Sequence, residues 1–349
     1  MTFTPNETVQ LFVCIQSFMF AFILLTDRGK KQNANRFLAA FLLMLSSQMA
    51  FILLEKWVGD YEPYIGYLCL FGFAYGPLLY GYSLQLIHRD LVLNKQQWLH
   101  ALPFIIVLIS GFLGFPLCYR FGSLLYISLL IYVILSIRQI VQYRKIVRNT
   151  RSAIDRINLK WLQWTLIVFT ITLITDIYSH FYEEIEPIPG VSVVSITLLV
   201  LVNGIFYKGV RQPQVFEGIS QSDRDLVTEK KVESGEYEKE AKALASFFEQ
   251  EQAYTNPDLT LAELAAMLEL TPRRLSEVIN RHFGQNFMDF INTHRIDFAK
   301  QRLLKPEDPK ETISEVMYAS GFNSKSSFNT LFKQKTGKTP SEFKRSQSR

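Results

Sequence analysis

The chain has 349 residues, of which 48% are hydrophobic and 20% charged, and its formal net charge is +5. These averages would suit two or three soluble domains, but they hide a division of the chain. Residues 1–210 hold 16 Lys and Arg with 11 Asp and Glu, whereas residues 211–349 hold 21 of each. The first part is too apolar for an ordinary soluble domain. This division argues against a single soluble enzyme, a disordered chain and a disulfide-rich secreted chain.

Seven long apolar runs fill residues 1–210. Each run is apolar on all faces of a helix, and a bilayer core of about 30 Å needs about 20 apolar residues as a helix. The fold class predicted is therefore all-α, with a seven-helix transmembrane bundle followed by a cytoplasmic two-module helix-turn-helix domain. The predicted spans are Val9–Leu25, Phe37–Leu54, Tyr64–Ile87, Trp98–Phe115, Gly122–Val141, Trp161–Tyr182 and Val191–Tyr207.

Basic residues alternate between the connectors of these runs. The connectors at 26–36, 88–97 and 138–160 hold 13 Lys and Arg, whereas the connectors between them hold two. Under the positive-inside rule, this places the N-terminus outside and the C-terminal part in the cytoplasm. The sequence thus predicts a multi-pass protein of the bacterial inner membrane.

One pair of ionisable residues lies inside a predicted span. Asp176 and His180 are four residues apart, so they share one face of a helix. Ionisable groups are costly in a membrane, which makes this pair the candidate signal site of the bundle. The alternative interpretation is a solvated helix end, because both residues lie in the outer third of the span and Glu183, Glu184 and Glu186 follow.

No pattern in the sequence indicates a catalytic centre. The three cysteines, Cys14, Cys69 and Cys118, lie in apolar runs without metal-ligand spacing. We find no Gly-rich phosphate loop, acyl-transfer triad or zinc spacing. The expectation is a protein that is not an enzyme and that has no catalytic residue, no metal and no cofactor.

An acidic linker is predicted at residues 211–236, ahead of a soluble domain at 237–349. Residues 217–251 hold ten acidic and five basic residues, with few apolar ones between 221 and 236. A helix is expected from about Tyr237, because Ala241, Leu244 and Phe248 recur at helical spacing.

A helix-turn-helix pattern occurs twice in this domain. Its first helix begins each time at a capping box, Thr260-Leu-Ala-Glu263 and Thr312-Ile-Ser-Glu315, where a hydroxyl and a carboxylate satisfy free backbone amides. The two modules are placed at about residues 260–284 and 312–337. One long helix at 287–304 joins them.

Equivalent positions of the two modules are 53 residues apart. Leu275 and Phe328 hold the same apolar position of the second helix. Gly284 and Gly337 both stand where that helix is expected to end. Two such units at a constant repeat are a specific signal for a DNA-binding domain.

These motifs resemble the C-terminal DNA-binding domain of AraC/XylS-type bacterial transcription regulators. The family's signature is similar to the second module: Gly321-Phe322-x-Ser324-x-Ser326-Ser327-Phe328-x-x-x-Phe332-Lys333-x-x-x-Gly337-x-Thr339-Pro340-x-x-Phe343-x-Arg345. The family's linker helix is similar to Phe290-Ile291-Asn292-x-x-Arg295-Ile296-x-x-Ala299-x-x-Leu303-Leu304. The resemblance covers about residues 240–346 and implies a membrane-integrated regulator, in which spans replace a soluble effector domain.

The resemblance also implies which residues meet DNA. On the first recognition helix, the face opposite the apolar core carries Arg273, Arg274, Ser276, Glu277, Asn280 and Arg281. The second carries Ser324, Lys325, Ser326, Asn329, Thr330 and Lys333. Arg273, Ser276 and Glu277 would face base edges, since Arg suits guanine and Glu accepts from cytosine. Thr330 stands where many family members have Arg, so the second module is expected to grip mainly phosphate.

Together these patterns predict a membrane-bound one-component transcription regulator. The spans would sense an unidentified ligand, and the cytoplasmic domain would bind promoter double-stranded DNA. The expected transmission path is the linker with the helix after Tyr237. Membrane lipid, RNA polymerase and a second copy of the chain, as a homodimer, are the other expected partners.

Two other functions compete with this hypothesis. A membrane enzyme or transporter with a regulatory DNA-binding tail would need convergent polar groups in the spans. A protein-interaction module that has lost DNA binding is disfavoured by the basic residues Arg273, Arg274, Lys325 and Lys333.

Overall fold

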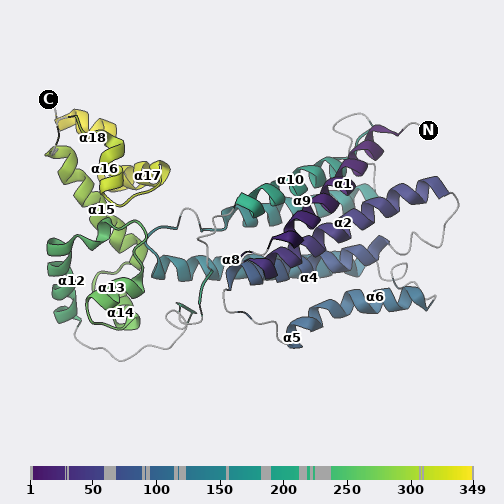
Figure 1. Ribbon diagram of the computed structural model, residues 1–349, viewed down its shortest axis with the longest axis horizontal. Coiled ribbons are helices and arrows are strands. Elements are labelled where there is room, and N and C mark those ends of the chain that lie inside the picture. Colours follow the sequence, from purple (N-terminus) through teal and green to yellow (C-terminus); the bar gives the residue numbers. More distant parts are fainter. Residues whose placement is uncertain are drawn as a thin grey trace. The chain divides into compact units, whose positions relative to one another are not determined.

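The computed structural model describes residues 3–27, 29, 31–58, 68–88, 91, 95–113, 117, 123–154, 157–181, 190–211, 218–220, 223–224, 237–305, 308 and 310–347. Within these ranges the regular elements are all helices (Figure 1). The chain forms two compact units. Unit 1 comprises Met1–Gln142 and Leu159–Gly218, and unit 2 comprises Tyr143–Asn158 and Ile219–Arg349.

Unit 1 is built from apolar helices, and each predicted span overlaps at least one of them. The helices are α1 (Pro5–Thr26), α2 (Gln32–Val58), α4 (Leu68–Ile87), α5 (Lys95–Trp98), the 3₁₀ turn η1 (Leu99–Ala101), α6 (Leu102–Phe112), α8 (Ser123–Thr150), α9 (Lys160–Phe181) and α10 (Val193–Arg211). The run predicted as Trp98–Phe115 begins later as α-helix, because Pro103 lies in the first turn of α6, where proline is favoured.

Four helices of the described part are long and apolar enough to cross a membrane: Pro5–Thr26, Gln32–Leu54, Leu124–Thr150 and Lys160–Tyr178. Leu99–Phe112 and Val193–Lys208 are shorter apolar helices. The fifth predicted span ends at Val141, but α8 continues to Thr150. Its last residues, Tyr143–Thr150, belong to unit 2 together with the connector that follows.

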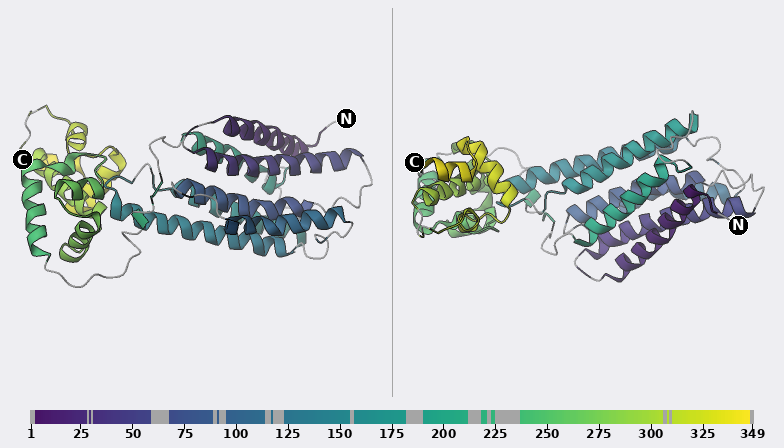
Figure 2. Two further views of the ribbon diagram at one scale, coloured as in Figure 1. Left: turned by 60° about the horizontal axis from the view of Figure 1, so that its bottom comes forward. Right: turned by 90° about the horizontal axis from the view of Figure 1, so that it is seen from above.

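Close helix contacts hold unit 1 together. In both views of Figure 2 the purple helices α1 and α2 lie side by side, and α10 also packs against α1. The rings of Phe20 and Phe206 stack with centroids 3.7 Å apart. A Cβ added at Gly76 of α4 would lie 2.6 Å from Tyr132 of α8, so only glycine permits this approach.

Unit 2 contains the helices predicted for the C-terminal domain. They are α12 (Glu238–Glu251), the 3₁₀ turn η2 (Ala253–Thr255), α13 (Leu261–Met267), α14 (Pro272–His282), α15 (Phe287–Leu304), α16 (Ile313–Ala319), α17 (Lys325–Thr336) and α18 (Pro340–Gln347). Both predicted capping boxes are present, at Thr260 and Thr312. The acidic linker predicted at 211–236 falls largely outside the described residues.

The long helix α15 takes part in two hydrophobic cores. Phe287, Phe290 and Ile291 pack in a cluster with residues of α12, α13 and α14. Ile296, Ala299 and Leu303 pack with residues of α16 and α17. Because one continuous helix contributes to both cores, the two helix-turn-helix modules are attached to a common rigid element.

Candidate nucleic-acid interface

The first recognition helix, α14, is fixed in its rotation by its buried face. Leu275, Val278 and Ile279 are fully buried in the module. The helix begins at Thr271, whose hydroxyl accepts a 3.2 Å hydrogen bond from the Arg274 amide. Pro272 at the first helical position favours this start. The polar residues of the helix are therefore left on its other side.

Four polar residues on that side form two side-chain pairs. The Nε of Arg273 lies 3.6 Å from Oε1 of Glu277, one helical turn away. The side-chain amide of Asn280 donates to the Ser276 carbonyl at 2.8 Å and contacts the Ser276 hydroxyl at 3.1 Å. These groups keep polar atoms at the surface, which is what contact with base edges requires.

The side chain of Arg274 interacts with other residues of the same domain. Its Nη2 lies 2.7 Å from Oε1 of Glu240 in α12, and its guanidinium lies 4.5 Å from the centroid of the Tyr237 ring. The hydrogen bond from Arg274 lowers the pKa of Glu240 below its usual range. The exposed Arg281 also lies over Tyr237, at 5.7 Å. Helix α12 thus covers one flank of α14, an arrangement that the local sequence pattern did not indicate.

The second recognition helix, α17, presents a simpler surface. Phe328 and Phe332 are fully buried, and Ser324 caps the helix by accepting a 3.4 Å hydrogen bond from the Ser327 amide. The exposed residues of the opposite side are Lys325, Ser326, Thr330 and Lys333, with Asn329 partly buried beside them. Neither lysine forms an ion pair with a residue in the described part of the chain. Lys325 is therefore available to phosphate groups, and so is Lys333, whose charge also helps to lower the pKa of the Glu342 carboxyl.

Arg295 of α15 connects the two modules. Its side chain is 1% exposed, with Nε 2.7 Å from the Tyr254 carbonyl and Nη2 2.7 Å from the Asn256 carbonyl. The guanidinium lies 5.7 Å from the centroid of the Phe322 ring in the second module. Burial lowers the pKa of Arg295 to about 10, so the group stays charged at neutral pH.

The turn of the second module also packs closely on the segment that Arg295 binds. Gly321 has a φ of +82°, and a Cβ added there would lie 2.6 Å from the Thr255 carbonyl oxygen. The buried face of α15 carries two polar residues, Asn292 and Arg295, and this interruption of an apolar face is the only local signal that could have indicated the junction. The Tyr254 and Asn256 carbonyls and the Phe322 ring lie 27 or more residues from that arginine, so these partners were not predictable from spacing.

The pair predicted as a signal site in unit 1 is only partly described. Asp176 is exposed on α9, and its Oδ2 accepts a 3.2 Å hydrogen bond from the Tyr126 hydroxyl of α8. His180 lies in the same helix, but its side chain is outside the described set. Among the described residues, no group of three or more His, Cys, Asp or Glu side chains could hold a metal ion.

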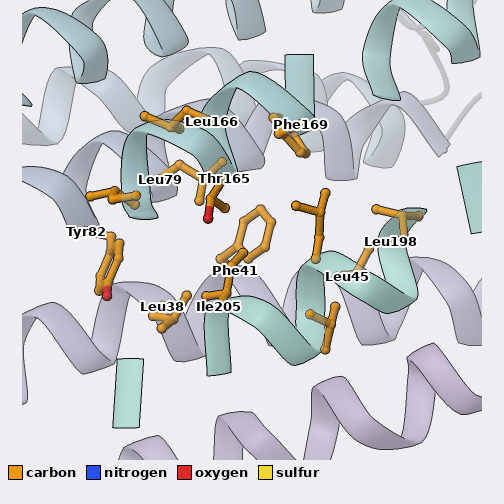
Figure 3. A pocket seen from close by; sticks show the side chains of 13 residues that line it. Leu38, Phe41, Leu45, Leu79, Tyr82, Thr165, Leu166, Phe169, Leu198 and Ile205 are labelled. Atoms are coloured by element: carbon orange, nitrogen blue, oxygen red, sulfur yellow. The ribbon is translucent and has the colours of Figure 1, made fainter. Parts of the chain in front are cut away.

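Unit 1 also encloses an apolar cavity between four helices, with a volume of about 20 Å³ for a water-sized sphere (Figure 3). A volume of this size matches about one water molecule. Its lining comes from α2, α4, α9 and α10 and consists of Leu38, Phe41, Leu45, Leu79, Tyr82, Leu162, Thr165, Leu166, Phe169, Leu198, Leu201, Val202 and Ile205. The hydroxyl of Thr165 is already bonded to the Trp161 carbonyl at 2.9 Å. The cavity therefore offers apolar packing space with few polar contacts.

Comparisons with known proteins match the C-terminal part of the chain. Residues 264–346 match a family described as a helix-turn-helix domain. An uncharacterized HTH-type transcriptional regulator of Staphylococcus aureus (strain MSSA476) is 32% identical over 93 residues, which are 27% of this chain and 12% of that protein. The transcriptional activator RhrA of Rhizobium meliloti (strain 1021) is 30% identical over 95 residues, which are 27% of this chain and 30% of RhrA.

The similarity is thus confined to one region and covers well under two thirds of either relative. No solved structure matches the chain. The family match runs from within α13 to α18 and includes all of α15, so this part of the chain is a helix-turn-helix domain of the kind found in transcription regulators. These matches support the resemblance to AraC/XylS-type regulators. The family match does not extend to the apolar helices of unit 1.

Proposed function

We propose that the chain is a membrane-bound one-component transcription regulator. Its apolar helices form a multi-pass sensor domain in a bacterial inner membrane, and its helix-turn-helix domain binds promoter DNA in the cytoplasm. The observation that carries this proposal is the presence, in one chain, of two recognition helices on a common helix and of several long apolar helices.

The spacing of the modules supports binding to one face of DNA. Helix α15 has 18 residues and is therefore about 27 Å long. Successive major grooves on one face of B-DNA are about 34 Å apart. The two recognition helices pack near opposite ends of α15, which is consistent with binding in successive major grooves. Arg273, Ser276 and Glu277 are assigned to base edges, and Ser324, Lys325 and Lys333 to phosphates.

The surface of unit 1 supports the membrane assignment. Large side chains are widely exposed on its helices, including Phe22 of α1 at 63%, Phe112 of α6 at 84% and Ile174 of α9 at 61%. Patches of this kind are unusual on soluble monomers and suit a lipid environment. Helix α8, with 28 residues, is about 42 Å long and exceeds a bilayer core of about 30 Å. Its basic C-terminal turns would extend into the cytoplasm.

The orientation follows from the alternation of basic connectors. A cytoplasmic reporter fused after Arg349 should be active, and a periplasmic reporter at the same place should be silent. The reverse result would reject the proposal, because the DNA-binding domain would then be separated from the chromosome.

DNA binding is tested with the full-length chain in membranes by mapping the genomic DNA that it retains. Wild-type protein should enrich discrete promoter fragments. A variant with Arg273→Ala and Lys333→Ala together should lose this enrichment while staying in the membrane. Equal recovery of all sequences by both proteins would contradict sequence-specific binding.

The signal is proposed to act at the bundle, with Asp176 and His180 as candidate contacts for an unidentified ligand. A ligand can shift the regulator only by binding two states of the bundle unequally. The proposed regulator also engages membrane lipid, and RNA polymerase and a second copy of the chain are its other proposed partners. The alternative of a membrane enzyme or transporter would need a convergent polar site in the spans, and the polar contacts described there are local pairs such as His88 with Gln139 at 3.3 Å and His100 with Tyr132 at 3.1 Å.

A further inference from the structure

The connector between α8 and α9 is part of unit 2 and binds the DNA-binding domain. Residues Tyr143–Asn158 belong to the same compact unit as Ile219–Arg349. Arg151 and Thr260 form an isolated antiparallel bridge, and the Ser152 amide donates a 3.2 Å hydrogen bond to the Leu259 carbonyl. More than 100 residues of sequence separate these partners. The connector is therefore held by tertiary contacts rather than by its neighbours in the chain.

Ser152 makes the central contact of this docking. Its side chain is buried, with the residue 2% exposed. The hydroxyl accepts a 3.1 Å hydrogen bond from Nη2 of Arg295 and donates one of 3.4 Å to the Pro257 carbonyl. A buried guanidinium needs acceptors for its five N–H groups, and Ser152 supplies one of them. Docking of the connector thus completes the environment of the residue that joins the two modules.

Two further hydrogen bonds fasten the connector to α8. The Tyr143 hydroxyl donates to the Ile157 carbonyl at 2.7 Å, and Nε of Arg144 donates to the Asn158 carbonyl at 2.9 Å. Since Tyr143 and Arg144 lie in α8, the connector moves with the end of this helix. The same helix runs back to Ser123 and is one of the four long apolar helices. A displacement of α8 is therefore passed directly to Ser152.

Other contacts of the connector are with the start of the first module, and Nη2 of Arg151 also lies 4.0 Å from Oδ2 of Asp223 in the linker. Thr260 is the N-cap of α13 and forms its capping box with Glu263. Arg295 in turn holds the Tyr254 and Asn256 carbonyls and faces Phe322 of the second module. The connector consequently touches the first module directly and the second through one arginine.

Resting on the function proposed above, we infer that this connector is the regulatory coupling element of the protein. When docked, Ser152 and Arg295 keep both modules in the fixed arrangement that binds two successive grooves. When a signal displaces α8, the connector leaves this site and the arrangement loosens. The apparent DNA affinity then falls in proportion to the fraction of molecules that keep the competent arrangement. This path runs through α8 and differs from the path through the linker and α12 that the sequence had suggested, although Arg151 of the connector also lies 4.0 Å from Asp223 of the linker.

The test uses full-length protein in lipid nanodiscs and a fluorescent duplex selected from a random library by the wild-type protein. Ser152→Ala removes the hydroxyl, and we expect about a threefold to tenfold increase in Kd. Thr150→Val is the matched control, because the buried Thr150 hydroxyl donates to the Ile146 carbonyl of its own helix at 3.0 Å and has no other hydrogen bond to a described residue. This control should stay within about twofold of wild type.

A second variant tests docking itself. Ser152→Lys places a cation beside Arg295 and should expel the connector, which weakens binding more than Ser152→Ala does. Hydrogen exchange should then be faster at the residue 152 amide, which is bonded to Leu259 in the docked state. If Ser152→Lys does not fold, Ser152→Ala and its control still decide the question.

The outcomes separate the two proposals. Equal Kd values for wild type, Ser152→Ala and Thr150→Val would overturn the coupling role, and so would equal weakening by both substitutions. In either case DNA binding by the wild-type chain would still support the regulator. Failure of wild-type protein to select or retain any duplex at low salt would instead overturn the proposed function.

Discussion

The guanidinium of Arg274 and the carboxylate of Glu240 form an ion pair at 2.7 Å, which joins the first recognition helix to α12. Both side chains are partly exposed, at 29% and 22%. The pair lies beside the Tyr237 ring, which also contacts Arg281. An arginine on the recognition helix is thus bound within the domain while its neighbour Arg273 remains on the surface assigned to DNA.

This pair should make stability depend on pH. The pKa of Glu240 is lowered in the folded state by its hydrogen bond with Arg274. Its stabilising contribution is therefore complete above the unfolded pKa of about 4.3 and is lost as the pH falls through the lower folded value. The unfolding temperature of Glu240→Gln should fall less between about pH 5 and pH 3 than that of wild type. Parallel curves for the two proteins would contradict this assignment.

Arg273 should specify one base position. Arg273→Ala is expected to cost about 1–3 kcal/mol of DNA binding and to relax preference at a single base pair. Competition binding against a set of single-base variants of the selected duplex measures this. An equal loss on every sequence would assign Arg273 to phosphate instead.

Lys333 should act on phosphate without specifying sequence. Lys333→Ala is expected to weaken binding to all duplexes alike and to reduce the slope of log K against log salt by about one unit. Titrations at several salt concentrations give this slope directly. Gln334, the next residue, is exposed on the same helix and offers a control as Gln334→Ala, whose salt slope should equal that of wild type.

Gly321 should be the most sensitive glycine of the second module. Gly321→Ala combines a φ of +82° with a Cβ only 2.6 Å from the Thr255 carbonyl oxygen. We expect a loss of about 3 kcal/mol or more in stability. Gly284→Ala is the matched control, since its φ is +65° but no atom lies within 4 Å of the added Cβ. It should cost about 1–2 kcal/mol, and equal losses measured by thermal unfolding would refute the contact argument.

Gly76 should be required for packing of α4 against α8. Gly76→Ala would bring a Cβ to 2.6 Å from the Tyr132 ring, and the unfolding temperature in detergent should fall. Gly204→Ala in α10, with no atom within 4 Å of its added Cβ, should leave this temperature unchanged or raise it. If the two variants changed the unfolding temperature by similar amounts, the close contact at Gly76 would not be what this interface requires.

Much of unit 2 was predictable because its signals are local. A hydroxyl and a carboxylate three residues apart define where α13 and α16 begin, and both capping boxes are confirmed. The helix predicted at 287–304 is confirmed as α15, and Gly337 ends α17 with a left-handed backbone. Apolar periodicity also assigned the buried faces of α14 and α17. The DNA contacts themselves remain predictions that the experiments above test.

The sequence by itself therefore determined the division of this protein into an apolar part and a more charged part, the helices within each part and the repeated module. These follow from composition, periodicity and capping, all of which act within a few residues of the chain. Only the tertiary structure decided that Arg274 turns to Glu240, that Arg295 joins both modules and that Ser152 docks beside it. Each of these contacts joins residues at least 27 positions apart, and local spacing carries no information about which distant carbonyl, carboxylate or hydroxyl a buried or partly buried cation will meet.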